Sequence, residues 1–359
     1  MRDDPSLRLL PVAVGGRSDQ RGVVATCNYA ARAFGVRSAM GTAQALQRCP
    51  GLVVLPPAME KYRIASRQIL AIYRDYTALV EPLSLDEAYL DVTHCMQHGG
   101  SATRIAQDIR ARIEATVGIT ASAGIAPNKF VAKIASDWNK PNGQFVVRPQ
   151  EVDAFVAALP VKKLFGVGKV TAARLHALGA LTCGDLRDWP HGELVRQFGK
   201  FGERLYQLCR GVDERFVNPH TERKSVSVEE TYSIDLPDAA ACALALDRLI
   251  IDLRVRIRRA AVTAPICKIF VKVRFADFRQ TSVECVAEAV DPATLQALLK
   301  TGLQRHSQSV RLLGVGVRLQ ERETDLLQLT LFDGESGSEV PSRISDATTS
   351  SDVNNAVSI

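Results

Sequence analysis

Two adjacent acids, Asp86 and Glu87, are the residues of this chain best suited to carry chemistry. They lie in the stretch Val-Glu-Pro-Leu-Ser-Leu-Asp-Glu-Ala-Tyr-Leu-Asp-Val, where the flanking apolar residues alternate as they do in strands. Carboxylate oxygens are the ligands that Mg²⁺ prefers, and a pair of such ions aligns the attacking and leaving oxygens of phosphoryl transfer. The stretch therefore predicts a tight strand pair that presents carboxylates to a metal. A solvated turn is the alternative.

A second candidate group, near the start of the chain, consists of Thr26, Tyr29 and Arg32, which follow one another at steps of three. If the chain becomes helical after Val24, these residues share one helix face. A hydroxyl, a phenol and a guanidinium on one face can hold a triphosphate, because Arg bonds phosphate oxygens in pairs. An ordinary amphipathic helix with an exposed Arg explains the spacing equally well.

Strands and helices alternate around the two acids, between residues 61 and 149. Helical spacing marks one segment with Ile105, Ile109 and Ile113, and a second helix is expected from about Phe130 to Trp138. This order predicts an α/β sandwich with helices on one face of a sheet that carries the acids. Three lysines are expected on or just beyond the polar side of the second helix: Lys129, Lys133 and Lys140.

Residues 150–215 are predicted to be helical and to contain a glycine turn, Gly166-Val-Gly168-Lys169, between helices. Such a turn leaves backbone N–H groups free at the start of a helix, where they favour a phosphate without reading any base. A new helix is expected after Thr182, with Asp185 completing its cap. A helical hairpin with a purely structural role remains the alternative.

A polar connector at residues 216–223 suits a link between domains, and a second α/β module follows at residues 224–320. Its pattern predicts the order β-α-β-β-α-β. Period-two spacing places Lys268, Lys272 and Arg274 on one face of its sheet, where they form a plausible surface for DNA phosphates. The arginines of its first helix are expected to form a solvated face.

Residues 321–359 differ from the rest of the chain. A short apolar stretch contains Gln328, Leu329, Leu331 and Phe332, and Gly, Ser, Asp and Asn are frequent after it. Such a composition predicts a flexible tail, because it buries too little to fold. The apolar stretch is expected to dock into a groove of a partner protein, although it could instead be a last strand of the preceding module.

The composition is that of a globular protein with several modules. The chain has 359 residues and a formal charge of +6, which favours a polyanionic partner without identifying it. Its eight cysteines include no Cys-x-x-Cys pair, so we expect neither a disulfide framework nor a cysteine-rich zinc site. With no signal segment and no apolar run of spanning length, we expect a cytoplasmic, nucleoid-associated protein without a membrane partner.

Five motifs in order resemble Y-family translesion DNA polymerases, in particular the bacterial DNA polymerase IV type. They are Thr26-Cys-Asn-Tyr-x-x-Arg, Ser84-Leu-Asp-Glu-Ala-Tyr-Leu-Asp, Ala135-Ser-Asp-x-Asn-Lys-Pro-Asn-Gly, Gly166-Val-Gly-Lys and Lys224-Ser. The resemblance implies a right-hand polymerase of α/β class. Its parts would be fingers at 1–60, a palm at 61–149, a thumb with a helix-hairpin-helix at 150–215, a linker at 216–223, a little finger at 224–320 and a tail at 321–359.

The resemblance also implies roles for particular residues. Asp86 and Glu87 would bind two Mg²⁺ ions and serve catalysis, and Thr26, Tyr29, Arg32 and Lys140 would contact the incoming deoxynucleotide triphosphate. Primer-template DNA would contact the glycine turn and the bases of the little finger. The stretch with Gln328, Leu329, Leu331 and Phe332 would bind the replicative sliding clamp. We expect the enzyme to act as a monomer.

One part of the family pattern lies outside this chain. Family members begin with a palm strand that carries another metal-binding Asp, followed by an aromatic residue that excludes ribonucleotides, and both lie upstream of Met1. Asp3 and Asp4 are no replacement, because they follow that segment and precede Pro5 in a polar loop. We therefore expect the palm sheet of the chain as given to lack a strand and to leave backbone groups unpaired. Either the true start lies upstream of Met1, which we favour, or the chain is a truncated form with impaired activity.

The resemblance thus implies an error-prone, lesion-bypass DNA polymerase that adds deoxynucleotides to a primer 3′ end during DNA repair and damage tolerance. A non-catalytic protein that binds DNA and the sliding clamp is the main alternative, and in it loss of the Asp86 carboxylate would change nothing. A two-metal nuclease would use the acids but not Thr26, Tyr29 and Arg32, so its activity would not depend on nucleotides.

Overall fold

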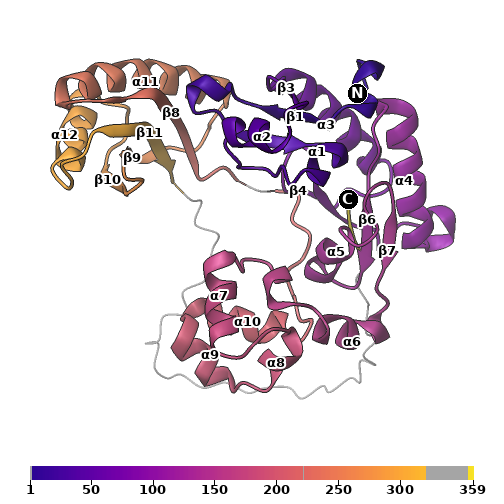
Figure 1. Cartoon of the computed structure of the whole chain (residues 1–359). Coiled ribbons are helices and arrows are strands. Elements are labelled where there is room, and N and C mark those ends of the chain that lie inside the picture. The colour runs from indigo at the N-terminus through magenta and orange to yellow at the C-terminus, as the bar shows by residue number, and fades with distance from the viewer. Residues whose placement is uncertain (1, 221, 321–354) are drawn as a thin grey trace, which may run out of the picture. The chain divides into compact units, whose positions relative to one another are not determined.

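The computed structural model describes residues 2–220, 222–320 and 355–359. The chain forms two compact units, whose elements are labelled in Figure 1. Among the described residues, one comprises 3–57 and 222–320, and the other comprises 58–220 and 355–359. None of the helices in the described ranges is both long enough and apolar enough to cross a membrane.

The first part of the first unit is a small sheet with the strand order β2-β1-β3. Strand β1 pairs antiparallel with β2 and parallel with β3. Small and branched apolar side chains form the core that these strands share with two short helices. In chain order the elements are η1 (Pro5–Leu9), β1 (Val12–Gly15), η2 (Ser18–Gln20), β2 (Val24–Cys27), α1 (Tyr29–Ala33), α2 (Thr42–Arg48) and β3 (Val53–Leu55).

The helix that we expected directly after Val24 begins only at Tyr29. Residues 24–27 are a strand because their backbone pairs with β1, which places Thr26 opposite Val14. The side chain of Asn28 then starts α1 by accepting a hydrogen bond from the Ala31 N–H at 3.0 Å. Thr26 therefore does not share a helix face with Tyr29, which corrects the prediction.

The rest of the first unit has the predicted β-α-β-β-α-β plan. Its antiparallel sheet has the order β10-β9-β11-β8, and two helices cover one face. Along β9, fully buried residues alternate with partly exposed ones, as the sequence predicted. The elements are β8 (Ser225–Leu236), α11 (Ala239–Arg259), β9 (Ile266–Phe275), β10 (Gln280–Val286), α12 (Pro292–Leu303) and β11 (Val310–Leu319).

The second unit is built on a five-stranded sheet with the order β4-β5-β12-β6-β7. Its strands are β4 (Val80–Pro82), β5 (Ala88–Asp91), β6 (Ala123–Ala126), β7 (Gln144–Val146) and β12 (Ala356–Ser358). β12 pairs antiparallel with β5 on one side and with β6 on the other. One prediction is therefore corrected: residues 355–359 are not part of a flexible tail, because β12 stands between β5 and β6. Composition missed this because the pairing is entirely long-range.

Helices cover both faces of the five-stranded sheet, not one face as predicted. The apolar sides of α3 (Met59–Arg74) and α4 (Ala102–Val117) pack against one face, and Ile105, Ile109 and Ile113 of α4 are buried there as expected. Helix α5 (Lys129–Ala135) packs against the other face. Figure 1 shows α4 and α5 on opposite sides of β6. A short helical turn, η3 (Gln97–Gly100), precedes α4.

Residues 149–208 form the helical region of the second unit, and their core is continuous with the α5 side of the sheet. The predicted glycine turn is present: Gly166 has a φ of +89°, and Gly168 precedes α7. Thr182 caps the next helix together with Asp185, as predicted. The elements are η4 (Pro149–Glu151), α6 (Val152–Ala157), η5 (Val161–Lys163), α7 (Lys169–Ala177), α8 (Cys183–Arg187), α9 (His191–Phe198) and α10 (Lys200–Leu208).

Candidate active site

Asp86 and Glu87 lie in the turn between β4 and β5, where the sequence predicted them. The Leu83 N–H donates to the Glu87 carbonyl oxygen at 2.9 Å, which closes the turn. The Ser84 hydroxyl donates to an Asp86 carboxylate oxygen at 2.5 Å, and the Asp86 N–H donates back to that hydroxyl oxygen at 3.3 Å. The turn therefore presents an exposed Asp86 carboxylate whose direction is set by a neighbouring hydroxyl.

The Glu87 carboxylate is held from the other end by a lysine. Lys133 of α5 donates from Nζ to Glu87 Oε1 at 3.0 Å, and the two side chains are 25% and 38% exposed. Since both are half-buried, each charge gains more from the other than an exposed pair would. The helical spacing predicted that Lys133 lies on the polar side of its helix. It could not predict the partner, because Glu87 is 46 residues away in the sequence.

Lys140, a predicted nucleotide contact, lies just beyond α5 and pairs with Asp137. Its Nζ is 2.6 Å from Asp137 Oδ1. Burial raises the pKa of Asp137, but the hydrogen bond from Lys140 and the charges of Lys140, Lys133 and Lys163 outweigh it, so the pKa lies below its usual value. Asp137 is therefore a carboxylate at neutral pH and keeps the ammonium group of Lys140 near the end of the helix.

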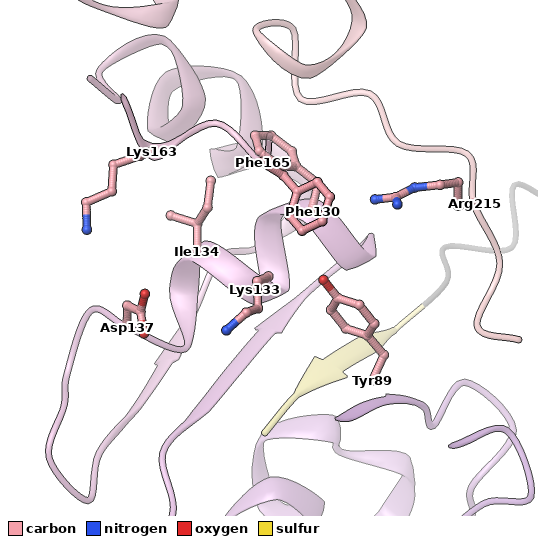
Figure 2. A pocket seen from close by; sticks show the side chains of 8 residues that line it. All are labelled: Tyr89, Phe130, Lys133, Ile134, Asp137, Lys163, Phe165 and Arg215. Carbon is pink, nitrogen blue, oxygen red and sulfur yellow. The ribbon is translucent and has the colours of Figure 1, made fainter. Parts of the chain in front are cut away.

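A small cavity of about 80 Å³ lies beside Lys133 and Asp137 (Figure 2). It has room for a few water molecules and not for a nucleotide. Its polar lining comes from β5, α5, the turn after α5, η5 and the segment after α10: Tyr89, Lys133, Asp137, Lys163 and Arg215. Burial is the main cause that raises the pKa of Tyr89 to about 12, so its hydroxyl stays protonated and can donate a hydrogen bond.

Lys129 is buried, which corrects its predicted place on the polar side of α5. Its residue is 4% exposed, and its Nζ donates to Glu81 Oε2 at 2.5 Å and to the Phe216 carbonyl oxygen at 2.9 Å. The same Glu81 oxygen accepts from the Asn218 N–H at 2.7 Å. Lys129 therefore belongs to a structural network that fastens the start of the predicted linker to the sheet.

The other three predicted nucleotide contacts lie in the first unit and are exposed there: Thr26, Tyr29 and Arg32. Arg32 and Tyr29 are neighbours on α1, with the guanidinium carbon 5.6 Å from the centre of the phenol ring. Arg32 Nε also donates to the Cys27 carbonyl oxygen at 3.2 Å, which orients the guanidinium. Thr26 projects from β2, so the set spans a strand and a helix.

The residues predicted to contact DNA lie on two surfaces. Gly166 and Gly168 lie in the turn before α7 in the second unit, and Lys169 is the first residue of that helix. In the first unit, Lys268, Lys272 and Arg274 share the face of β9 that the helices do not cover. Two of these bases pair there with acids, Lys268 with Glu284 at 2.8 Å and Lys272 with Glu229 at 2.7 Å. Alternation in β9 alone could not reveal the acids on the neighbouring strands.

Comparison with known families supplies the identification. The profile of the impB/mucB/samB family matches residues 1–137, and that of the family's C-terminal domain matches residues 223–331. Between them, residues 162–213 match the thumb domain of DNA polymerase iota. The DNA polymerase IV of Ralstonia nicotianae is 61% identical over 332 residues, which span 92% of this chain and 93% of that protein. This chain belongs to the impB/mucB/samB family, the Y family of DNA polymerases.

Further relatives agree with this assignment. A DNA polymerase IV of Pseudomonas putida is 57% identical over 92% of this chain and 94% of its own length. Among solved structures, a Y-family polymerase chimera of Dbh and Dpo4 is similar with a TM-score of 0.80 and 29% identity, over 88% of this chain and 93% of that one. DinB from Sulfolobus solfataricus has a TM-score of 0.59 at 28% identity over the same shares.

The predicted family and right-hand fold are thereby confirmed, and the chain is a DNA-directed DNA polymerase of the lesion-bypass class. A non-catalytic DNA-binding protein is not favoured. The four residues of the predicted clamp-binding stretch, Gln328, Leu329, Leu331 and Phe332, lie outside the described residues.

Y-family polymerases use divalent metal ions, and the acidic turn has donors of the right chemistry for them. The carboxylates of Asp86 and Glu87 are hard oxygen ligands. Within residues 2–220, 222–320 and 355–359, no three His, Cys, Asp or Glu side chains are grouped so that they could hold a metal.

Proposed function

We propose that Asp86 and Glu87 are the catalytic carboxylates of this polymerase and that they hold two Mg²⁺ ions during nucleotide addition. The observation that carries this proposal is the geometry of the turn. The turn exposes the Asp86 carboxylate, which accepts a hydrogen bond from Ser84, and it places the Glu87 carboxylate in an ion pair with Lys133. When bound, such ions stabilise the charge that develops on the transferred phosphoryl group. The protein's own part is to fix the direction of both carboxylates before the ions arrive.

We further propose that Thr26, Tyr29, Arg32 and Lys140 bind the incoming deoxynucleotide triphosphate. Arg32 offers a planar fork for phosphate oxygens, and its orientation is supported by the Cys27 carbonyl. Lys140 offers a point charge whose position is supported by Asp137. Tyr29 and Thr26 add hydroxyl groups that can donate to the triphosphate.

Primer-template DNA would be held through its phosphates. The glycine turn exposes backbone N–H groups beside Lys169, and the face of β9 adds Lys268, Lys272 and Arg274. A solved relative, the insertion ternary complex of Dbh DNA polymerase, is 29% identical with a TM-score of 0.60. The stretch with Gln328, Leu329, Leu331 and Phe332 would engage the sliding clamp. The working enzyme would be a monomer.

Primer extension with Mg²⁺ and deoxynucleotides tests the catalytic assignment. Asp86→Asn and Glu87→Gln should each lower the rate by at least about a hundredfold, because loss of one group aimed at the transition state costs roughly 3 kcal/mol. Glu60→Gln, which changes an exposed acid of α3 in the same unit, is the matched control. Equal rates for Asp86→Asn and the control would contradict the proposal, and so would extension that does not depend on divalent ions.

A further inference from the structure

Arg110 of α4 binds the two connections that lead into β6 and β7, which are parallel neighbours in the sheet. Its Nε donates to the Ala121 carbonyl oxygen at 2.9 Å, just before β6. Its Nη1 donates to Gln144 Oε1 at 3.2 Å. Its Nη2 donates to Asn142 Oδ1 at 2.9 Å and to the Asn142 carbonyl oxygen at 2.5 Å. A single side chain thus makes four hydrogen bonds to loops that are otherwise separate.

Two further contacts hold the second of these loops on α4. Gln144 Nε2 donates to the Thr103 carbonyl oxygen at 3.1 Å, and Asn142 Nδ2 donates to Glu114 Oε2 at a longer distance of 3.5 Å. Asn142 has a φ of +51°, a conformation that asparagine tolerates better than most residues. Its amide therefore joins Arg110 and Glu114 at a position where the backbone alone would favour glycine.

The same loop carries Lys140, and it is tightly packed between Lys140 and the part that Arg110 binds. Asn139 Nδ2 donates to the Gln144 carbonyl oxygen at 2.8 Å across the loop. The backbone of Gly143 lies so close to Asn139 that an added Cβ would be 2.1 Å from the Asn139 carbonyl oxygen. Asn139 directly precedes Lys140. A shift at residues 142–144 would therefore move the backbone beside Lys140, because no free space separates them.

The ion pair with Asp137 is too exposed to fix Lys140 by itself. The two side chains are 39% and 49% exposed, and ion pairs of this kind contribute little. Helices α4 and α5 lie on opposite sides of β6 (Figure 1), and the Asp137 contact comes from the end of α5. Arg110 holds the loop from the α4 side. The backbone that carries Lys140 is thus fixed mainly from α4.

We propose that Arg110 is a positioning residue for nucleotide binding, which holds residues 139–144 in the conformation that brings Lys140 to the triphosphate. The role rests on the proposed function of Lys140 as a nucleotide contact. The docking of the loop on α4 does not, so it can be tested separately. Arg110 itself would not touch the nucleotide, because its hydrogen bonds are directed to the two loops.

Hydrogen exchange of the full chain tests the docking. Arg110→Met keeps a long apolar side chain but removes every donor. The Ala123 amide donates to the Gly143 carbonyl oxygen at 3.0 Å, so in this variant it should exchange on the order of tenfold faster. Arg104→Met, which changes an exposed arginine of the same helix, is the matched control and should leave Ala123 unchanged. The Cys183 amide of the helical region should not change in either variant.

Nucleotide affinity tests the positioning. The probe is the matching deoxynucleotide triphosphate with Mg²⁺, titrated calorimetrically into the protein bound to a primer-template whose primer ends in a dideoxynucleotide, so that no addition can occur. Arg110→Met should weaken binding roughly fivefold, within the range of coupling between residues of one network. Lys140→Ala should weaken it at least as much. Adding Arg110→Met to Lys140→Ala should have no further effect, because no ammonium group is left to position.

The inference is overturned if Ala123 exchanges alike in Arg110→Met and Arg104→Met. It is also overturned if Arg110→Met weakens nucleotide binding by the same factor with and without the Lys140 side chain. If Lys140→Ala binds the nucleotide like the parent, the nucleotide role of Lys140 fails and the positioning role fails with it, while the exchange of Ala123 still reports the docking. If only Lys140→Ala weakens binding, the inference about Arg110 alone is wrong.

Discussion

Lys129 is a charged side chain in the interior of the second unit, and its charge is balanced by one acid. Its side chain is 6% exposed and that of Glu81 is 16% exposed. Lys129 Nζ also bonds the Phe216 carbonyl and lies 5.3 Å from the centre of the Tyr89 ring. A buried charge of this kind is tolerated because its partner and its hydrogen bonds replace the lost water. Removing the acid alone should therefore be costly.

Glu81→Gln should lower the free energy of unfolding of the second unit by about 3–5 kcal/mol, because it leaves the buried ammonium group unpaired. Urea unfolding followed by tryptophan fluorescence measures this. The chain has two tryptophans, Trp138 and Trp189, and both belong to the second unit. The double variant Glu81→Leu with Lys129→Met is the control and should recover most of the loss. A single variant as stable as the parent would show that the pair is not desolvated.

The two glycines of the turn before α7 have different structural roles. Gly166 has a φ of +89°, and an added Cβ would lie 2.9 Å from the ring of Phe201. Gly168 has a φ of −82°, and no atom lies within 4 Å of an added Cβ. Gly166 is therefore needed for the fold of the turn. The fold does not require a glycine at position 168. The proposed reason for Gly168 is that a DNA phosphate can approach its backbone closely.

Gly166→Ala should lower the melting temperature of the second unit by roughly 3–6 °C, since a strained backbone costs about 1–2 kcal/mol. Gly168→Ala should melt like the parent but bind primer-template DNA more weakly, because its methyl group would stand between the backbone N–H groups and the phosphate. Thermal unfolding and fluorescence anisotropy with labelled DNA measure the two effects. An unchanged DNA affinity in Gly168→Ala would argue against the phosphate site.

At the scale of the whole molecule, the formal charge of +6 matters less than where the charges lie. The open face of β9 carries three bases, but Glu284 bonds both Lys268 and Arg318, and Glu229 bonds Lys272. These pairs reduce the positive field of the face in the absence of DNA. Phosphates would have to compete with the acids, so binding should be moderate and should depend strongly on salt.

Lys272→Ala should weaken primer-template binding and reduce the slope of log K against log salt concentration by about 0.9, the value for one lost phosphate contact. Glu229→Gln should tighten binding at low salt, because it frees Lys272 from its partner. Arg258→Ala is the matched control, because Arg258 is exposed on α11, which covers the opposite face of the sheet. A salt slope that is the same for Lys272→Ala and Arg258→Ala would rule out this face as a phosphate contact.

Local patterns in the sequence were sufficient for much of this protein. They predicted the order of strands and helices in residues 224–320, the buried isoleucines of α4, the cap formed by Thr182 and Asp185, and the acidic turn. Each of these features depends on residues within a few positions of one another, because helix periodicity, strand alternation and capping are local properties of the chain.

Tertiary structure alone decided the features that join distant residues. Thr26 is on a strand because β1 pairs with it, Lys129 is buried because Glu81 neutralises it, and residues 356–358 form a strand because β5 and β6 pair with them on both sides. These features depend on which distant residues the folded chain brings into contact. The free energy of pairing between distant segments outweighs the weak preference of a short segment for helix or strand. The composition of residues 321–359 carries no sign of this pairing, because both partner strands lie far away in the sequence.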